Sequence, residues 1–196
     1  LISKRGMPLH AIHFHSFPYT SELAKNKVIS LAKIISEYTG NITLHVIPFT
    51  KIQEEIHKRC KPEYMITLMR RIMMRISERI AKANGLKAIV TGESLAQVAS
   101  QTIESMTVTN AVIEDLPVLR PCIAMDKEDI IAISRKINTY ETSILPYEDC
   151  CTVFLPEHPI IKPKIDKVEK EEIRLDIEEL INDAISQEEI INTRDI

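Results

Sequence analysis

The sequence predicts an α/β fold with a doubly wound, mainly parallel sheet. Apolar strand-like segments alternate with amphipathic helical segments, several of these segments end at a glycine, and 44% of the 196 residues are hydrophobic. A chain of this length buries roughly 70% of the surface that its unfolded form exposes, so one sizeable core is expected. Strands separated by helices are typical of parallel strands whose connecting helices pack on the faces of the sheet.

The N-terminal quarter predicts a strand, a helix and a second strand. Residues 1–6 have the pattern of a last helical turn, with basic residues followed by a capping glycine. A strand is expected from Leu9 to His15, and Thr20 or Ser21 can cap a helix that ends at Gly40. Residues 42–47 predict the second strand. Because the chain begins with Leu rather than Met, we expect it to start within a longer polypeptide.

The later elements are predicted from the same patterns. In chain order they are helices over 52–58 and 62–83, a strand over 88–91, a helix from Leu95 towards Met106, a strand over 117–121, and a helix over 127–137 that Asp126 can cap. Charged residues dominate the C-terminal segment. The sequence therefore predicts one domain over residues 1–165 and a charged C-terminal helical tail over 166–196 that adds no new core.

Composition excludes several classes of protein. A formal net charge of -3 argues against a chain that binds nucleic acid through its overall charge, although basic residues gather in 51–87 and leave a local basic face open. The sequence has no apolar run long enough to cross a bilayer and no secretory signal, which predicts a cytoplasmic protein with no membrane partner. Four cysteines at irregular spacing predict neither a disulfide scaffold nor a metal site.

Three loops are candidate site segments because ligands of parallel sheets bind beyond the carboxyl ends of the strands. These loops cover residues 13–20, 91–94 and 120–122. Gly92 would let a ligand approach the backbone closely, and a helix that begins after Ser94 would favour an anion. The alternative is structural, since many parallel sheets turn their corners with a glycine and a capping serine.

Arginines and cysteines offer further chemistry. On the helix predicted over 62–83, methionines at core spacing indicate a buried stripe, and Arg71, Arg75 and Arg79 are expected to be solvated. Cys150 and Cys151 are adjacent in a predicted loop, where a reactive thiol fits better than a strained disulfide. A pair of ordinary reduced cysteines is the alternative.

Several long stretches, taken together, resemble one known family. They are His13–Glu22, Met69–Arg71, Thr91–Leu95 with Gln97–Thr102, Leu116–Pro121 and Ile144–Cys151. In this order they resemble the catalytic domain of the tRNA 4-thiouridine synthetase family, also called tRNA sulfurtransferase and linked to thiamine biosynthesis. The resemblance implies an ATP-pyrophosphatase (adenine nucleotide alpha hydrolase-like) fold. It also implies that the family's first strand and phosphate loop would lie upstream of Leu1.

The resemblance further implies an activity and a site. Such enzymes use ATP to adenylate the uracil O4 of a tRNA uridine and then replace AMP with sulfur from a persulfide to give 4-thiouridine. The implied nucleotide-binding residues are His13, Phe14, Arg70, Gly92 and Gln101, and the implied sulfur-handling thiol is Cys150 or Cys151. ATP with accompanying Mg²⁺, tRNA and a cysteine desulfurase as sulfur donor are the expected ligands and partners, and a homodimer stays open.

Two other interpretations stay open. One is another ATP-pyrophosphatase-type enzyme, such as a different tRNA thiolase or an amide-forming synthetase, which would lack the segment from Pro146 to Cys151. The other is a non-catalytic fragment. Without the backbone amides of a phosphate loop, residues 1–196 are expected to bind ATP poorly and to be inactive alone.

Overall fold

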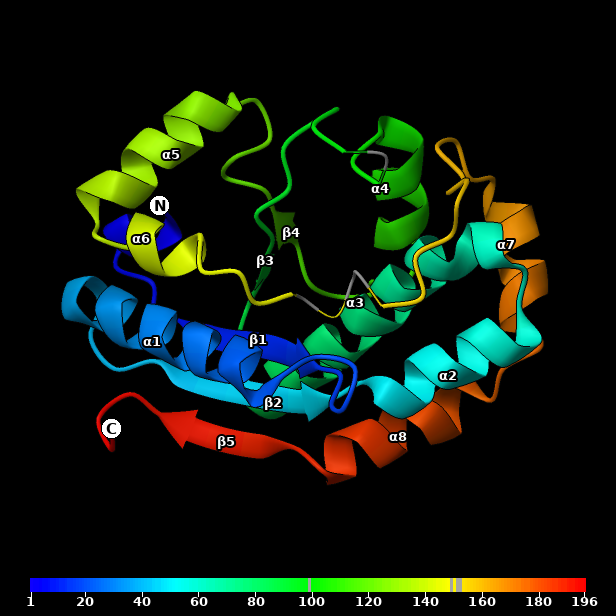
Figure 1. Cartoon of the computed structure of the whole chain (residues 1–196), viewed down its shortest axis with the longest axis horizontal. Helices are drawn as coiled ribbons and strands as arrows, with labels where there is room; N and C mark the ends of the chain where they lie inside the picture. Colours follow the sequence, from blue (N-terminus) through cyan, green and yellow to red (C-terminus); the bar gives the residue numbers. More distant parts are fainter. Residues whose placement is uncertain (99, 149, 151–152) are drawn as a thin grey trace. The chain divides into compact units, whose positions relative to one another are not determined.

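The computed structural model describes residues 1–98, 100–148, 150 and 153–196. The chain forms two compact units. The first unit contains residues 1–50, 125–150 and 186–196, and the second contains residues 51–124 and 151–185. Each unit combines helices with a small sheet (Figure 1), and two of the three strand pairings are parallel, as the predicted α/β class requires.

The sheet of the first unit has three strands in the order β1-β2-β5. β1 (His10–His15) and β2 (Thr43–Pro48) run parallel, and β5 (Glu189–Asn192) is antiparallel to β2. Helix α1 (Glu22–Thr39) connects β1 to β2 and packs against β1 (Figure 1). β1 is therefore an edge strand of this sheet among the described residues, and its carboxyl end opens into the loop that precedes α1.

The ends of these first elements confirm the local predictions. Ser21 caps α1, because its Oγ accepts a hydrogen bond of 3.3 Å from the backbone N–H of Ala24. Gly40 ends the helix at φ 79°, in the left-handed region that favours glycine. Upstream, the 3-10 turn η1 (Ile2–Arg5) ends at Gly6 with φ 76°, as the basic and glycine pattern predicted.

Two short helices complete the first unit. They are α5 (Lys127–Lys136) and α6 (Tyr140–Ser143), and α6 packs against α1. Asp126 occupies the cap position of α5, but its side chain makes no capping bond within the described residues, so the predicted cap chemistry was wrong.

The second unit is organised around the long helix α3 (Met65–Ala83). It contacts α4 (Ile103–Asn110), α7 (Ile165–Glu172) and β3 (Ile89–Val90), and β3 pairs in parallel with β4 (Val118–Leu119). Before α3 lie α2 (Thr50–Arg59) and the 3-10 turn η2 (Pro62–Tyr64). Leu68, Ile72 and Ile76 of α3 are fully buried, which confirms the apolar stripe as core.

The helix predicted from Leu95 to Met106 begins eight residues later than expected, at Ile103. Thr102 caps it by accepting a 3.1 Å hydrogen bond from the backbone N–H of Ser105. Ala96 in the preceding loop has φ 62°, which is incompatible with a right-handed helix at that position. Residues after β3 therefore form a loop, and this loop contributes to the candidate site.

The segment 166–196 differs from the expected peripheral helical tail. It contains all of α7 after Ile165, helix α8 (Ile177–Ser186) and strand β5, and Val168 and Ile181 are fully buried. The apolar residues of both helices share one face, so a segment with high overall charge still contributes to a core. The expectation that it adds no core was wrong, whereas the division of the chain at residue 165 stays a prediction.

Opposite charges pair along the basic segment 51–87 of the second unit. Arg71, expected to be solvated, has a side chain only 3% exposed and donates two hydrogen bonds of 2.8 Å to Glu172. Arg75 also bonds Glu172, and Arg79 bonds Glu178. The solvated interpretation fails for Arg71 because α7 and α4 cover that side of α3. Paired in this way, these arginines do not form the basic face that the sequence left open.

None of the helices in the described ranges is long and apolar enough to span a bilayer.

Candidate nucleotide-binding site

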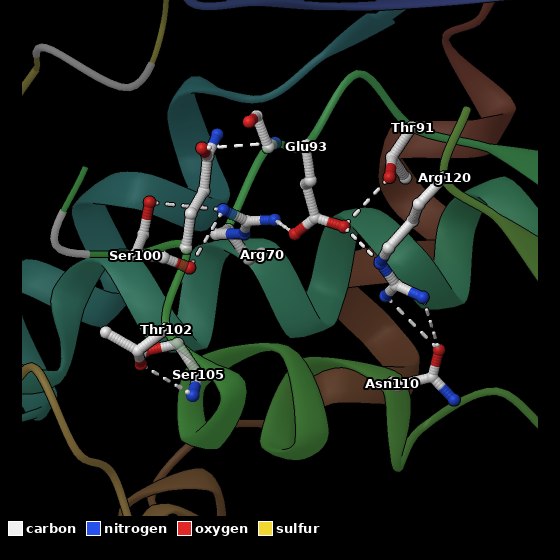
Figure 2. A network of polar contacts seen from close by, with 10 residues as sticks. Arg70, Thr91, Glu93, Ser100, Thr102, Ser105, Asn110 and Arg120 are labelled. Carbon is white, nitrogen blue, oxygen red and sulfur yellow. Dashed lines mark hydrogen bonds and ion pairs between the residues drawn. The ribbon is translucent and has the colours of Figure 1, made fainter. Parts of the chain in front are cut away.

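A buried carboxylate joins two arginines at the carboxyl ends of β3 and β4. Glu93 lies three residues after β3, Arg120 directly follows β4, and Arg70 comes from α3. Figure 2 shows both guanidinium groups directed at the two oxygens of Glu93: Arg70 contacts Oε1, and the Nε of Arg120 donates to Oε2 at 2.7 Å. The hydroxyl of Thr91 donates to the same Oε2 at 2.8 Å. Two parallel strands thus bring segments that are distant in sequence to one place.

The electrostatics of this cluster favour an anion. The side chain of Glu93 is 6% exposed, those of Arg70 and Arg120 are 19% and 17% exposed, and the three groups together have an excess of one positive charge. Burial opposes ionisation of Glu93, but the Arg70 charge and the hydrogen bonds from Thr91 and Arg120 outweigh it and lower the pKa of this carboxyl. The carboxylate stays charged at neutral pH. The excess positive charge lies on two mostly buried arginine side chains, where water screens it less than on an exposed surface.

The loop after β3 holds the other predicted residues of this unit. Gly92 is exposed, and a Cβ placed on it would have no atom within 4 Å, so a ligand could approach its backbone closely. Gln101 accepts a hydrogen bond of 3.3 Å from the backbone N–H of Ser94. The Nη1 of Arg70 donates to the carbonyl and hydroxyl oxygens of Ser100 at 3.3 and 3.1 Å (Figure 2). Hydrogen bonds therefore hold Arg70 and Gln101 to the loop after β3, and Gly92 lies in this loop directly before Glu93.

The other two predicted nucleotide-binding residues, His13 and Phe14, lie in the first unit. His13 and Phe14 are neighbours on β1 and, as successive strand residues, their side chains lie on opposite faces of the sheet. The ring of Phe14 is half-buried and packs edge-on against the buried Phe49, at 5.1 Å between centroids, so the side chain is held by the protein and the backbone is the part left for recognition. Beyond the strand, Ser16 and Thr20 close a short loop, since Thr20 N–H donates to the Ser16 carbonyl at 2.9 Å.

Cys60 and Cys150 are both buried thiols. Cys150 is buried, at 7% exposure, and Cys151 lies outside the described residues. Just before them, the Lys27 ammonium donates to the Tyr147 carbonyl at 2.7 Å and anchors this segment to α1. Cys60 is buried next to Glu171, and burial together with that carboxylate raises its pKa to about 11. A thiol of this kind stays protonated at neutral pH and is a poor nucleophile.

No group of three or more histidine, cysteine or acidic side chains suited to a metal ion occurs within the described ranges.

The family model described as Thiamine biosynthesis protein (ThiI) matches residues 1–177. The chain belongs to this family. Its relatives include a probable tRNA sulfurtransferase of Acetivibrio thermocellus, 56% identical over the whole chain, and one of Alkaliphilus oremlandii, 55% identical over 97% of it. The chain spans 50% and 48% of the lengths of these two relatives.

A solved structure gives the same family assignment. The structure of a 4-thiouridine synthetase in complex with RNA and bound ATP superposes with a TM-score of 0.90 at 36% identity, and the match covers 96% of this chain and 50% of that one. The similarity confirms the ATP-pyrophosphatase type of fold that the family resemblance implied.

Two residues of the network were not named as ligand residues from the sequence. Glu93 and Arg120 nevertheless fall in two of the three strand-end loops that the topology rule selected. The available signal was their position directly after predicted strands. Their pairing with each other and with Arg70 requires the parallel register of β3 and β4, which places Val90 opposite Leu119.

Proposed function

We propose that this chain is the nucleotide-binding part of an enzyme that uses ATP to convert a tRNA uridine to 4-thiouridine, with the thiamine link that the family name carries. The observation that supports this most is that Arg70 and Gln101 hydrogen-bond to the loop that contains Gly92, at the carboxyl ends of two parallel strands. The solved 4-thiouridine synthetase contains bound ATP, which supports ATP as the nucleotide.

Each residue has a distinct proposed task. The backbone of His13 and Phe14 contacts the adenine edge, the exposed backbone at Gly92 lets the nucleotide approach, and Gln101 fixes the loop through Ser94. Arg70 places positive charge next to the phosphates. Mg²⁺ would arrive with ATP, held mainly by phosphate oxygens and water, which is the usual mode for this ion.

The sulfur step is assigned to the pair Cys150 and Cys151. After uracil O4 has displaced pyrophosphate from ATP, the terminal sulfur of a cysteine persulfide attacks uracil C4 and displaces AMP, which leaves the uridine joined to the cysteine through a disulfide. A second thiol then attacks the cysteine sulfur of that disulfide, so that 4-thiouridine leaves and a new disulfide forms between the two thiols. A thiol reductant returns this disulfide to two thiols before the next turnover. A cysteine desulfurase supplies that sulfur, and tRNA is the acceptor. Persulfide transfer needs an accessible thiol, and the residue that takes the sulfur from the donor is either Cys150 or Cys151. We further propose a cytoplasmic location for the enzyme and leave a homodimer as an assembly to be measured.

The full-length protein tests this function. It should bind ATP and, with desulfurase, cysteine and unmodified tRNA, form 4-thiouridine that mass spectrometry of the tRNA nucleosides detects. Omitting ATP or desulfurase should abolish the product. ATP binding with no persulfide on either cysteine after incubation with desulfurase and cysteine would favour the amide-forming or other thiolase alternative. No ATP binding at all would favour the non-catalytic one.

A further inference from the structure

Glu93 contacts both arginines of the candidate site. Each of its oxygens receives a guanidinium group, and Thr91 fixes the second oxygen from within the same loop. The carboxylate is buried and its charge is retained at neutral pH. A group in this position determines where both guanidinium groups lie and also the course of the backbone next to Gly92.

Arg120 retains hydrogen-bonding capacity in the direction away from Glu93. Its Nη1 and Nη2 reach Asn110 Oδ1 at 3.4 and 3.3 Å, which are long bonds that a phosphate oxygen could replace at little cost. Within the part of the chain that the structure describes, the Nε of Arg70 has no hydrogen-bond partner. Both side chains are partly exposed, so both can reach a ligand.

A second carboxylate in the same unit, Glu172, forms an ion cluster with a structural role and serves as a comparison for Glu93. Glu172 also bridges two arginines, with bonds of 2.7–3.0 Å to Arg71 and Arg75, and it also has a lowered pKa because hydrogen bonds from these arginines and their charges outweigh burial. Arg71 differs from Arg70 in being 3% exposed and in donating its third bond to the Val108 carbonyl at 2.7 Å. That cluster lies between helices, away from the ends of β3 and β4.

From this contrast we propose that Glu93 is a positioning residue and that Arg120 is a second phosphate-binding arginine of the ATP site. The inference rests on the proposed function. Glu93 neutralises one of the two guanidinium charges and holds the pair side by side, so that the remaining positive charge faces the phosphate groups of ATP. Arg70 and Arg120 then act together on the phosphates, and neither contributes to recognition of adenosine.

The test compares ATP and adenosine binding in the full-length protein by calorimetry, with adenosine reporting the part of the site that holds no phosphate. Arg120→Gln and Glu93→Gln should each weaken ATP binding by about tenfold or more, since charged hydrogen bonds are lost. Adenosine affinity should stay unchanged. Arg120→Lys should restore part of the ATP affinity, because it keeps the charge without the fork of donors.

Glu172→Gln and Arg75→Gln are the matched controls. They should lower the unfolding midpoint at least as much as the site variants do and leave the ATP affinity unchanged. Equal losses of ATP and adenosine affinity in Glu93→Gln would assign Glu93 a merely structural role. Wild-type ATP affinity in Arg120→Gln, or a loss confined to tRNA binding, would overturn the phosphate role of Arg120 while the proposed function stands. Absence of ATP binding by the wild-type protein would overturn both.

Discussion

Replacing Glu172 with Gln isolates the contribution of a buried ion cluster to stability. Glu172 accepts four hydrogen bonds from Arg71 and Arg75, and the side chain of Arg71 is 3% exposed. Removing one partner from a buried pair typically costs about 3–5 kcal/mol, because the other charge stays buried without compensation. The side chain of Arg75 is 22% exposed and partly hydrated, so we expect a loss near the lower end of that range.

Urea denaturation at several pH values measures this loss. The lowered pKa of Glu172 means that its stabilisation is present above the ordinary glutamate pKa and is lost as pH falls through the folded-state pKa. The wild-type protein should therefore exceed Glu172→Gln in free energy of unfolding at pH 7, and the difference should shrink steadily under acidic conditions. A difference below about 1 kcal/mol at pH 7, within the range of an exposed pair, would refute the reasoning.

Three further predictions concern the candidate site and the thiols. Arg70→Ala should weaken ATP binding by about 1–3 kcal/mol in calorimetry, whereas Arg79→Ala, whose partners lie on α8, should leave it unchanged; equal losses would indicate a general charge effect. Replacing both Cys150 and Cys151 with Ser should abolish desulfurase-dependent 4-thiouridine formation without changing ATP affinity, and normal thiolation by that variant would exclude the persulfide role. Cys60 should react with iodoacetamide in the folded protein far more slowly than in urea, because its pKa is raised to about 11; similar rates would contradict the burial of this thiol.

Local patterns predicted the elements whose ends depend on neighbouring residues. Helix α1 begins after the capping side chain of Ser21 and ends at Gly40, which tolerates a positive φ, so both ends depend on properties of single residues. The alternating segment before them forms β1. The predicted start of the helix after β3 was wrong because the apolar residues of that loop happen to have helical spacing. There, Thr102 supplies a cap at a later position, and the bond from Ser94 N–H to Gln101 favours a loop.

Tertiary contacts account for the other differences. From the sequence alone, an arginine on a helix such as Arg71 is expected to be solvated. Only the packing of α7 and α4 on α3 places it beside Glu172. Strand β5 has no periodicity of its own over four residues, and its pairing partner on β2 lies far away in sequence. The candidate site could be predicted only in part. Each strand end can be predicted from its own sequence, whereas the contact between Glu93 and Arg120 depends on the register of the two strands.

Strand β5 also determines when the first unit can be completed during synthesis. Thr43 and Asn192 are opposite each other in the sheet and bond through their side chains across 149 positions, so β2 leaves the ribosome long before its neighbour exists. Until then the outer edge of β2 presents unpaired backbone groups to other chains. Substitutions in Glu189–Asn192 would accordingly lower the yield of folded protein in the cell, while molecules that do fold would retain the nucleotide affinity of the wild type.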